Sequence, residues 1–305
     1  MTTSILTYGR VTWTNITHPT DEDILQLARR YPQFHPLNLK DCMTELEFPK
    51  IDHHDDYLFL VVQFPYWDTT EKISRPAEID IFVAKGILVT SHRNELKPLN
   101  ELFSAAQADE SIRAEIMENG ASPLLHNLLN RLVDYCFPIL VKVDHQIQRI
   151  EEQLFRRDTR SILNDIALIR RDVIALRRIL HPQREVINKL KSGRWLFIHE
   201  ELDLYWGDLV DHLSQLCAML DEHSEVILGL SDTIDTLASH RIDEVIRLLT
   251  MVTILTLPIT LLATIFGMNI VMPFADHPVL FFSILGIGIF LTISIVYYLR
   301  KHRML

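Results

Sequence analysis

An apolar stretch near the C-terminal end of the 305-residue sequence contains five threonines spaced three or four residues apart. Steps of alternately three and four residues place side chains on one face of a helix. The face that follows these steps contains Asp243, Ile246, Thr250, Thr253, Leu257, Thr260 and Thr264. Hydroxyl groups in such a row gain nothing from facing lipid, whereas they can bond to other helices or to water. We name this face the threonine seam and expect it to pack against other helices or to line a lumen.

Two uncharged segments must hold this seam in place. The first, Leu248–Gly267, would span about 30 Å as a helix, which is the thickness of the hydrocarbon core of a bilayer. The second is Val279–Leu299, and the link Met268–Pro278 joins them. The pattern predicts two transmembrane helices over residues 248–267 and 279–299, with a loop at 268–278. The alternative of two buried helices in a soluble core stays open, although paired charge-free segments of this length are typical of membrane spans.

Charged residues beside the two segments indicate their orientation. Arg241 and Arg247 precede the first segment, and a basic tail, residues 300–305, follows the second, whereas the link has no Lys or Arg. Basic residues favour the cytoplasmic side of a membrane. We therefore expect a multi-pass protein of the cell membrane whose N-terminal body and C-terminal tail are both cytoplasmic.

The rest of the chain is an acidic body. Residues 1–247 contain 27 basic and 39 acidic side chains, whereas residues 248–299 contain a single charged one, Asp276. A surplus of acids argues against a surface that binds nucleic-acid phosphates. The three cysteines are well separated and fit a reducing compartment. We expect no secretory signal in the first ten residues.

The body divides into parts with different patterns. Residues 1–120 alternate between strand and helix patterns, and Asp21–Arg30 reads as a helix that Thr20 caps. Residues 121–198 and 199–247 read as long amphipathic helices. We predict an α+β fold in which an N-terminal α/β domain is followed by a helical hairpin and a stalk helix.

Further features are expected within these parts. The pair Lys85-Gly86 suggests a β-hairpin. Pro138 and Pro182 should kink or break the long helices. The stalk pattern continues over His199–Phe266, which is about 100 Å of helix if it is unbroken. Such a helix needs partners for its apolar stripe, and two membrane helices cannot enclose a lumen. A homo-oligomer therefore follows if the seam faces water.

A short motif at the start of the outer link indicates a protein family. Gly267, Met268 and Asn269 stand at the outer end of the first predicted span, near the C-terminus and after an acidic body. In this position the motif resembles that of the CorA family of magnesium transporters. The resemblance extends over most of the chain, including residues 35–41 and 182–186. It implies a funnel-shaped homopentamer that takes up Mg²⁺ and is not an enzyme.

The resemblance also implies roles for single residues. Gly267, Met268 and Asn269 would form the selectivity filter, where Gly267 lets the backbone turn tightly and a ring of Asn269 oxygens accepts hydrogen bonds from a hydrated cation. The seam would line the pore, and Ile246 and Leu249 would form a hydrophobic constriction that closes by losing its water. The alternatives that stay open are a helix C-cap for Asn269, which the context disfavours, and a coiled-coil core for the apolar pair, which without the family is as good an interpretation as the constriction.

A regulatory cation site is the second implication. The family senses cytoplasmic Mg²⁺ with carboxylates that bridge neighbouring subunits. The matching positions are Asp41, Asp208 and Asp211, with Asp232 further along the stalk. Bound Mg²⁺ would relieve the repulsion between these acids and favour the closed state. Without the family, they would be ordinary surface acids.

Three positions depart from the family pattern. Lys40 replaces an acid beside Asp41, Asp243 stands where the family usually has Asn, and Phe274 replaces a Glu in the outer link. Zinc-transporting relatives also lack that Glu, so transport of Co²⁺, Ni²⁺ or Zn²⁺ is the alternative within the family. The expected partners are the lipid bilayer and further copies of the chain.

Two functions outside the family compete with transport. An enzyme anchored to the membrane would find metal-ligand types in His53-His54-Asp55-Asp56. Consecutive strand residues point in opposite directions, however, and we favour a solvated loop there. A membrane-tethered structural coiled coil would explain the long helices but leaves the threonine seam without a role.

Overall fold

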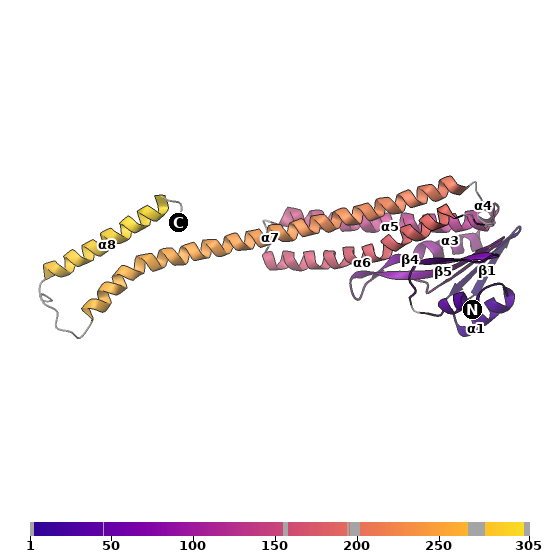
Figure 1. The fold of residues 1–305 in the computed structure, drawn as a ribbon, viewed down its shortest axis with the longest axis horizontal. Coiled ribbons are helices and arrows are strands. Elements are labelled where there is room, and N and C mark those ends of the chain that lie inside the picture. Colours follow the sequence, from indigo (N-terminus) through magenta and orange to yellow (C-terminus); the bar gives the residue numbers. More distant parts are fainter. Residues whose placement is uncertain are drawn as a thin grey trace. The chain divides into compact units, whose positions relative to one another are not determined.

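The chain forms two compact units, Met1–Ser231 and Asp232–Leu305 (Figure 1). A computed structural model describes residues 3–44, 46–154, 158–193, 195, 202–267 and 278–301. The first unit contains a β-sheet with helices on both faces, and the second unit is helical in its described part. This composition confirms the predicted α+β class.

A six-stranded sheet forms the centre of the α/β part. Its strands are β1 (Thr3–Tyr8), β2 (Val11–Thr17), β3 (Lys50–His53), β4 (Tyr57–Asp68), β5 (Ile73–Ala84) and β6 (Ile87–His92). They lie in the order β1-β2-β6-β5-β4-β3, and only β2 and β6 are parallel among these neighbours. The predicted hairpin is confirmed, because β5 and β6 pair on either side of Lys85-Gly86. Gly86 has a φ of 73°, which glycine adopts without steric cost.

Two short helices cover one face of the sheet. Helix α1 (Asp21–Arg30) begins where it was predicted, since Thr20 accepts a hydrogen bond from the Asp23 N–H and the Asp23 carboxylate accepts one from the Thr20 N–H. Helix α2 (Pro36–Asp41) follows. Between them, Phe34 stacks on a phenylalanine of β5 with 4.4 Å between the ring centroids. This aromatic contact fixes both helices to the sheet.

Four further helices of the first unit lie on the other face of the sheet (Figure 1). They are α3 (Lys97–Ala108), α4 (Glu110–Met117), α5 (Ala121–Gln153) and α6 (Thr159–Ser192). Helices α5 and α6 confirm the predicted long amphipathic pair. Both continue through a proline, Pro138 and Pro182, so of the two expected outcomes, a kink or a break, the break does not occur. Buried side chains on both sides of each proline hold the helix in the core, and this packing outweighs one missing backbone hydrogen bond.

Helix α7 (Asp203–Phe266) is unbroken over 64 residues and confirms the predicted continuous pattern. In the first unit it buries a stripe at helical spacing that contains Trp206, Leu209, Leu213, Leu216, Leu220, Ile227 and Leu230. The Trp206 ring contacts His126 of α5, and Asp221 pairs with Arg177 of α6 at 2.9 Å. The stripe therefore packs α7 against the helical hairpin.

The second unit contains the remainder of α7 and helix α8 (Pro278–Lys301). Within the described ranges, one helix is long and apolar enough to cross a membrane, over Asp203–Leu261, and its most apolar segment has no buried residue. The second predicted span falls in α8, whose apolar segment Leu285–Tyr298 is shorter. Pro258 of α7 and Gly288 of α8 line one narrow apolar gap, so the two helices lie side by side.

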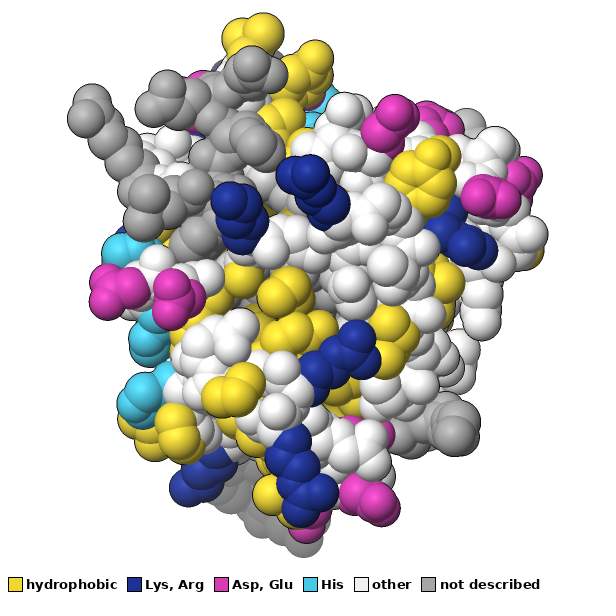
Figure 2. Space-filling model, turned by 90° about the vertical axis from the view of Figure 1, so that its right-hand side faces the viewer, with side chains coloured by type: hydrophobic (Ala, Val, Ile, Leu, Met, Phe, Trp, Pro, Cys, Tyr) yellow, Lys and Arg dark blue, Asp and Glu magenta, His cyan; other side chains and the backbone are white. Residues whose placement is uncertain are grey.

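Figure 2 shows one face of the molecule, at the end where the sheet lies. Lys and Arg side chains are spread over this face among apolar ones, and many of the Asp and Glu side chains lie toward its edges. A surface that follows a nucleic-acid backbone needs contiguous basic side chains. The face drawn does not present such a surface.

Candidate ion pathway and cation sites

Every residue of the threonine seam is exposed in a single chain. The largest apolar side chain in its middle, Leu257, is 63% exposed. Hydroxyl and apolar groups together on an exposed helix face are covered in the working protein by something outside one chain, such as other helices or the water of a lumen. The exposure thus leaves open both roles that the sequence suggests.

The threonine hydroxyls of the seam share one hydrogen-bond geometry. Each lies within hydrogen-bond distance of the carbonyl oxygen four residues earlier, at 2.7 Å from Thr250, 2.9 Å from Thr253, 3.0 Å from Thr260 and 2.6 Å from Thr264. Thr260 and Thr264 share their hydrogen with the carbonyl three residues earlier, at 2.9 Å and 3.0 Å. A hydroxyl has one hydrogen and two lone pairs, so these bonds leave acceptor capacity toward the exterior. A row of neutral oxygen acceptors suits a cation or the hydrogens of its water shell.

The N-terminal end of the seam has a different character. Asp243 is an exposed carboxylate, and Ile246 and Leu249, which follow it on α7, are 54% and 65% exposed. Asp232, one of the predicted regulatory acids, is also exposed and lies at the start of the second unit. A constriction that closes by losing its water needs apolar side chains of this kind at its narrowest point.

The structure describes one residue of the predicted filter, Gly267. Helix α7 ends at Phe266, and the Gly267 N–H donates to the Ala263 carbonyl oxygen at 2.9 Å. The chain leaves the helix in a turn at Gly267, whose φ is not positive, so this turn does not use the left-handed conformation that favours glycine. A Cβ atom there would lie 3.0 Å from the Ala263 oxygen, which is a closer contact than most Cβ atoms make. Met268 and Asn269 lie outside the described residues.

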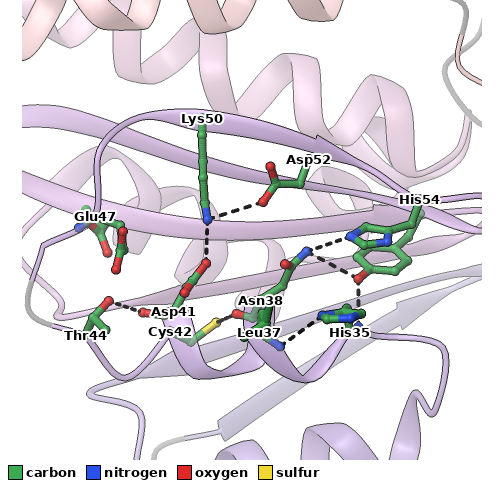
Figure 3. Close-up of polar contacts among 12 residues, drawn as sticks. His35, Leu37, Asn38, Asp41, Cys42, Thr44, Glu47, Lys50, Asp52 and His54 are labelled. Atoms are coloured by element: carbon green, nitrogen blue, oxygen red, sulfur yellow. Dashed lines mark hydrogen bonds and ion pairs between the residues drawn. The ribbon is translucent and has the colours of Figure 1, made fainter.

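The first predicted regulatory acid, Asp41, is paired with a lysine. Asp41 is the last residue of α2, and its Oδ2 atom lies 2.6 Å from the Nζ atom of Lys50 on β3 (Figure 3). Lys50 also lies 3.3 Å from the Asp52 carboxylate. Burial alone would lower the pKa of Lys50, but the hydrogen bond to Asp41 and the charge of Asp52 outweigh it and raise that pKa. Within one chain, Asp41 therefore already has a cationic partner.

Helix α2, which carries Asp41, is held by residues of the adjoining strand and loop. His35 caps the helix, because its Nδ1 atom accepts a hydrogen bond of 3.2 Å from the backbone N–H two residues later. The Tyr57 hydroxyl of β4 accepts bonds from the His35 N–H at 2.8 Å and from the Asn38 side chain at 3.3 Å. The His54 ring stacks on Tyr57 with 4.4 Å between centroids. These contacts fix the position of Asp41 on the sheet.

The segment 53–56 contains two histidines that contact aromatic rings. His53 ends β3, is exposed and contacts the Trp195 ring, and residues 54–56 form the expected loop before β4, in which Asp55 and Asp56 are exposed. Burial, and then the nearby His35, lowers the pKa of His54. Among the residues that the structure describes, no group of three or more His, Cys, Asp or Glu side chains is arranged to hold a metal ion.

The other predicted regulatory acids, Asp208 and Asp211, lie on α7. Both are exposed, and the Asp208 side chain is 66% exposed. His212 lies beside Asp208, with 3.8 Å between its Nε2 atom and the carboxylate, and its Nδ1 atom is 4.0 Å from Asp134 of α5. Exposed carboxylates at this place are available to a neighbouring molecule, as a site shared between subunits requires.

Sequence reasoning missed two carboxylates in the charged surroundings of Asp41. Asp80 of β5 is buried, and its burial, then the charges of Glu78 and Asp41, raise its pKa well above the usual value. Glu78 accepts a hydrogen bond from the Glu47 N–H, and burial raises the pKa of Glu78. The available signal was the spacing, because two acids at alternate positions of an otherwise apolar strand point to one face.

Comparison with known proteins gives matches over almost the whole chain. The family model described as CorA-like Mg²⁺ transporter protein matches residues 8–301. YfjQ of Bacillus subtilis is 28% identical over 293 residues, covering 95% of this chain and 88% of that protein. The cobalt/magnesium transport protein CorA of Thermotoga maritima is 26% identical over 298 residues, covering 95% and 82%. The zinc transport protein ZntB of Pectobacterium atrosepticum is 20% identical over 228 residues, covering 74% and 68%.

Solved structures share the fold. The complete structure of the CorA magnesium transporter from Methanocaldococcus jannaschii matches with a TM-score of 0.82 and 21% sequence identity. The match covers 97% of this chain and 92% of that one. At this identity the likeness is one of fold, and it includes both the α/β part and the long helices.

Proposed function

The chain belongs to the family of CorA-like Mg²⁺ transporter proteins, and from this premise we propose that it mediates Mg²⁺ uptake as a channel. Members of the family are membrane proteins that transport divalent cations, so the enzyme alternative is wrong. The preference for Mg²⁺ is the finer part of the proposal. Co²⁺, Ni²⁺ and Zn²⁺ are its alternatives, because relatives are named cobalt/magnesium and zinc transport proteins.

The row of threonine acceptors is the observation that carries the proposal. The hydroxyls of Thr253, Thr260 and Thr264 give their hydrogens to the backbone of α7 and leave acceptors on an exposed face. Mg²⁺ dehydrates reluctantly, so neutral acceptors for its water shell suit passage better than fixed carboxylates, which would hold it. An inside-negative potential contributes about 4.6 kcal/mol per 100 mV to the entry of two charges, taking ~2.3 kcal/mol for each.

We infer that the working protein is a homo-oligomer, and specifically a pentamer. A single α7 cannot surround a lumen, and its seam is exposed in one chain. A closed ring gives every copy the same two neighbours and covers the seam without leaving an open end. In such a ring Ile246 and Leu249 form the constriction, Gly267, Met268 and Asn269 form the filter, and the α/β part and both termini are cytoplasmic.

Regulation by cytoplasmic Mg²⁺ is the last part of the proposal. Asp208, Asp211 and the constriction residues belong to one helix, whereas Asp41 belongs to α2. A cation between Asp41 of one copy and Asp208 of the next would hold neighbouring copies together and favour the closed state. Asp232 adds a further carboxylate along the same helix. When Mg²⁺ is scarce, no cation bridges the neighbouring copies and the closed state loses this support.

Flux into liposomes that contain the purified full-length chain tests the transport. We expect Mg²⁺ entry that rises with an inside-negative potential, and we would offer Zn²⁺, Co²⁺ and Ni²⁺ separately as alternatives. The absence of flux for every dication would contradict transport. Flux of Zn²⁺ with none of Mg²⁺ would replace the proposed ion and leave the family assignment intact.

The filter is tested by Asn269→Ala. Loss of the amide oxygen should strongly reduce Mg²⁺ flux, because hydrated Mg²⁺ loses its acceptor at the outer mouth. Ser283→Ala is the matched control, since the Ser283 hydroxyl donates to the Val279 carbonyl within α8 and has no assigned role in the pore. Wild-type flux through the Asn269 variant would remove this residue from the filter.

A further inference from the structure

The ion pair of Asp41 with Lys50 lies where the proposed regulatory Mg²⁺ would bind. The Nζ atom of Lys50 is 2.6 Å from Asp41 Oδ2 and 3.3 Å from Asp52 Oδ2 (Figure 3). The side chains of Lys50 and Asp41 are 34% and 18% exposed, so the pair is accessible from solvent but partly enclosed. We propose that Lys50 is a tethered competitor of the regulatory dication. It occupies Asp41 when cytoplasmic Mg²⁺ is low and is displaced when Mg²⁺ binds. This inference rests on the proposed role of Asp41.

The chemistry of the two cations makes them exclusive. Mg²⁺, or a water of its shell, needs the carboxylate lone pairs that the Lys50 ammonium now uses. A dication within a few ångströms of an ammonium group is also repelled by it. Lys50 stays charged at neutral pH because its pKa is raised further above an already high ordinary value. Lys50 therefore keeps its charge whether or not Mg²⁺ is bound, and only the position of its ammonium group changes.

The backbone contacts make the lysine side chain the part that moves. The Asp41 carbonyl oxygen accepts two hydrogen bonds from Thr44, from the N–H at 2.9 Å and from the hydroxyl at 2.6 Å. Lys50 is held in register opposite Val61 of β4. With both backbones fixed, displacement needs only rotation of the flexible four-carbon stem of the lysine. Asp52 then remains as a partner for the displaced ammonium group.

The consequence is a raised threshold for regulation. Mg²⁺ must break an existing ion pair before it uses Asp41, so inhibition begins at a higher cytoplasmic concentration than a free carboxylate would allow. Lys40 provides a comparison, because it is adjacent to Asp41 in the sequence and exposed, yet the described contacts of Asp41 do not include it. If the positive charge near Asp41 mattered more than the direct ion pair with Lys50, removing either lysine would change the inhibiting Mg²⁺ concentration equally.

The experiment compares Lys50→Gln, Lys50→Arg and Lys40→Gln in the full-length chain. One readout is the internal Mg²⁺ concentration that half-inhibits Mg²⁺ flux into liposomes, with a Mg²⁺-free interior as each variant's reference. The other is the Mg²⁺ concentration that gives half of the thermal stabilisation in detergent, which does not depend on transport. We expect Lys50→Gln to lower both concentrations about threefold, within the range that an exposed ion pair supports. For Lys50→Arg, both concentrations should stay near the wild-type values. Lys40→Gln should lower them less than Lys50→Gln does.

Asp41→Asn separates this inference from its premise. If Asp41→Asn weakens Mg²⁺ inhibition while Lys50→Gln leaves it unchanged or weakens it, the regulatory role of Asp41 stands and competition by Lys50 is overturned. If Mg²⁺ inhibits the Asp41→Asn variant as it inhibits the wild type, Asp41 has no regulatory role. The inference about Lys50 then fails together with this premise. In the double variant Asp41→Asn with Lys50→Gln, competition predicts the same half-inhibiting Mg²⁺ concentration as in Asp41→Asn alone. If Lys50→Gln lowered that concentration as much as it does in the wild type, competition would be overturned. The thermal curves identify any variant that has not folded, and Lys50→Met then replaces Lys50→Gln.

Discussion

The backbone N–H of Ser74 donates a hydrogen bond of 2.6 Å to the Asp172 carboxylate, across 98 positions of the sequence. Asp172 is 7% exposed and Ser74 is 3% exposed, so the bond is shielded from water. It joins β5 of the sheet to α6 of the helical hairpin. The strand that it fixes also carries Glu78 and Asp80, and it lies beside β4, which positions α2 and the proposed regulatory acid.

Removing the Asp172 carboxylate should destabilise the first unit. Asp172→Ala leaves a buried N–H without its acceptor, and we expect a loss of about 2 kcal/mol in the free energy of unfolding. Asp172→Asn is the control, because its amide oxygen still accepts the bond and the loss should be smaller. Thermal or denaturant unfolding of the purified chain measures both. Equal stability of the Ala variant and the wild type would contradict this account of the contact.

The threonine seam predicts a difference between two neighbouring hydroxyls. Thr260→Val keeps the shape of the side chain but removes the oxygen, so Mg²⁺ flux should fall severalfold, while Thr260→Ser should retain it. Thr256→Val is the matched control, because Thr256 also donates to a carbonyl four residues earlier, at 2.9 Å, but lies off the seam. Equal fluxes through Thr260→Val and Thr256→Val would mean that the seam does not line the pathway.

The proposed regulatory site predicts a change in inhibition without a change in ion preference. Asp208→Asn removes one negative charge from the site, so a higher internal Mg²⁺ concentration should be needed to inhibit flux. Asp203→Asn is the control, since Asp203 is an exposed acid in the first turn of the same helix. The measurement is the half-inhibiting Mg²⁺ concentration in liposomes. Identical values for Asp208→Asn and wild type would exclude this residue from the site.

His92 predicts how stability depends on pH. Burial, and then the nearby His18, lowers the pKa of His92 to about 4. Its Nε2 atom faces the Asn15 Oδ1 atom at 3.0 Å, and its Nδ1 atom accepts the Asn94 N–H at 3.0 Å. The neutral ring can satisfy both contacts, whereas the protonated ring would present a second N–H to the Asn94 N–H.

The sign of the effect follows from the lowered pKa. The neutral ring stabilises the fold fully above pH 6.5, and this contribution is lost as the pH falls toward 4, by about 3 kcal/mol in all. His92→Gln removes the titration, so its unfolding free energy should vary less between pH 6.5 and 4 than that of the wild type. Thermal unfolding across this range measures the difference. If the unfolding free energies of the wild type and His92→Gln changed equally with pH, His92 would not be the source of the pH dependence.

Much of the architecture could be predicted from features that act over a few residues. Thr20 and Asp23 cap α1 across one helical turn, and Gly86 permits the turn between β5 and β6. The 3.6-residue period of apolar side chains in the sequence indicated α5, α6 and α7. The Gly267-Met268-Asn269 motif, placed between two uncharged segments, identified the family. Each of these signals lies within a short length of chain and can be recognised before the chain folds.

The tertiary structure decided how distant or differently placed groups meet. Packing in the core carries the helices through Pro138 and Pro182, against the local preference. The Ser74 N–H meets its acceptor, the Asp172 carboxylate, across 98 positions of the chain. The pairing of Lys50 with Asp41 depends on the position of α2 beside β3. An ion pair needs a separation of a few ångströms, and only the folded sheet with its packed helix sets that separation.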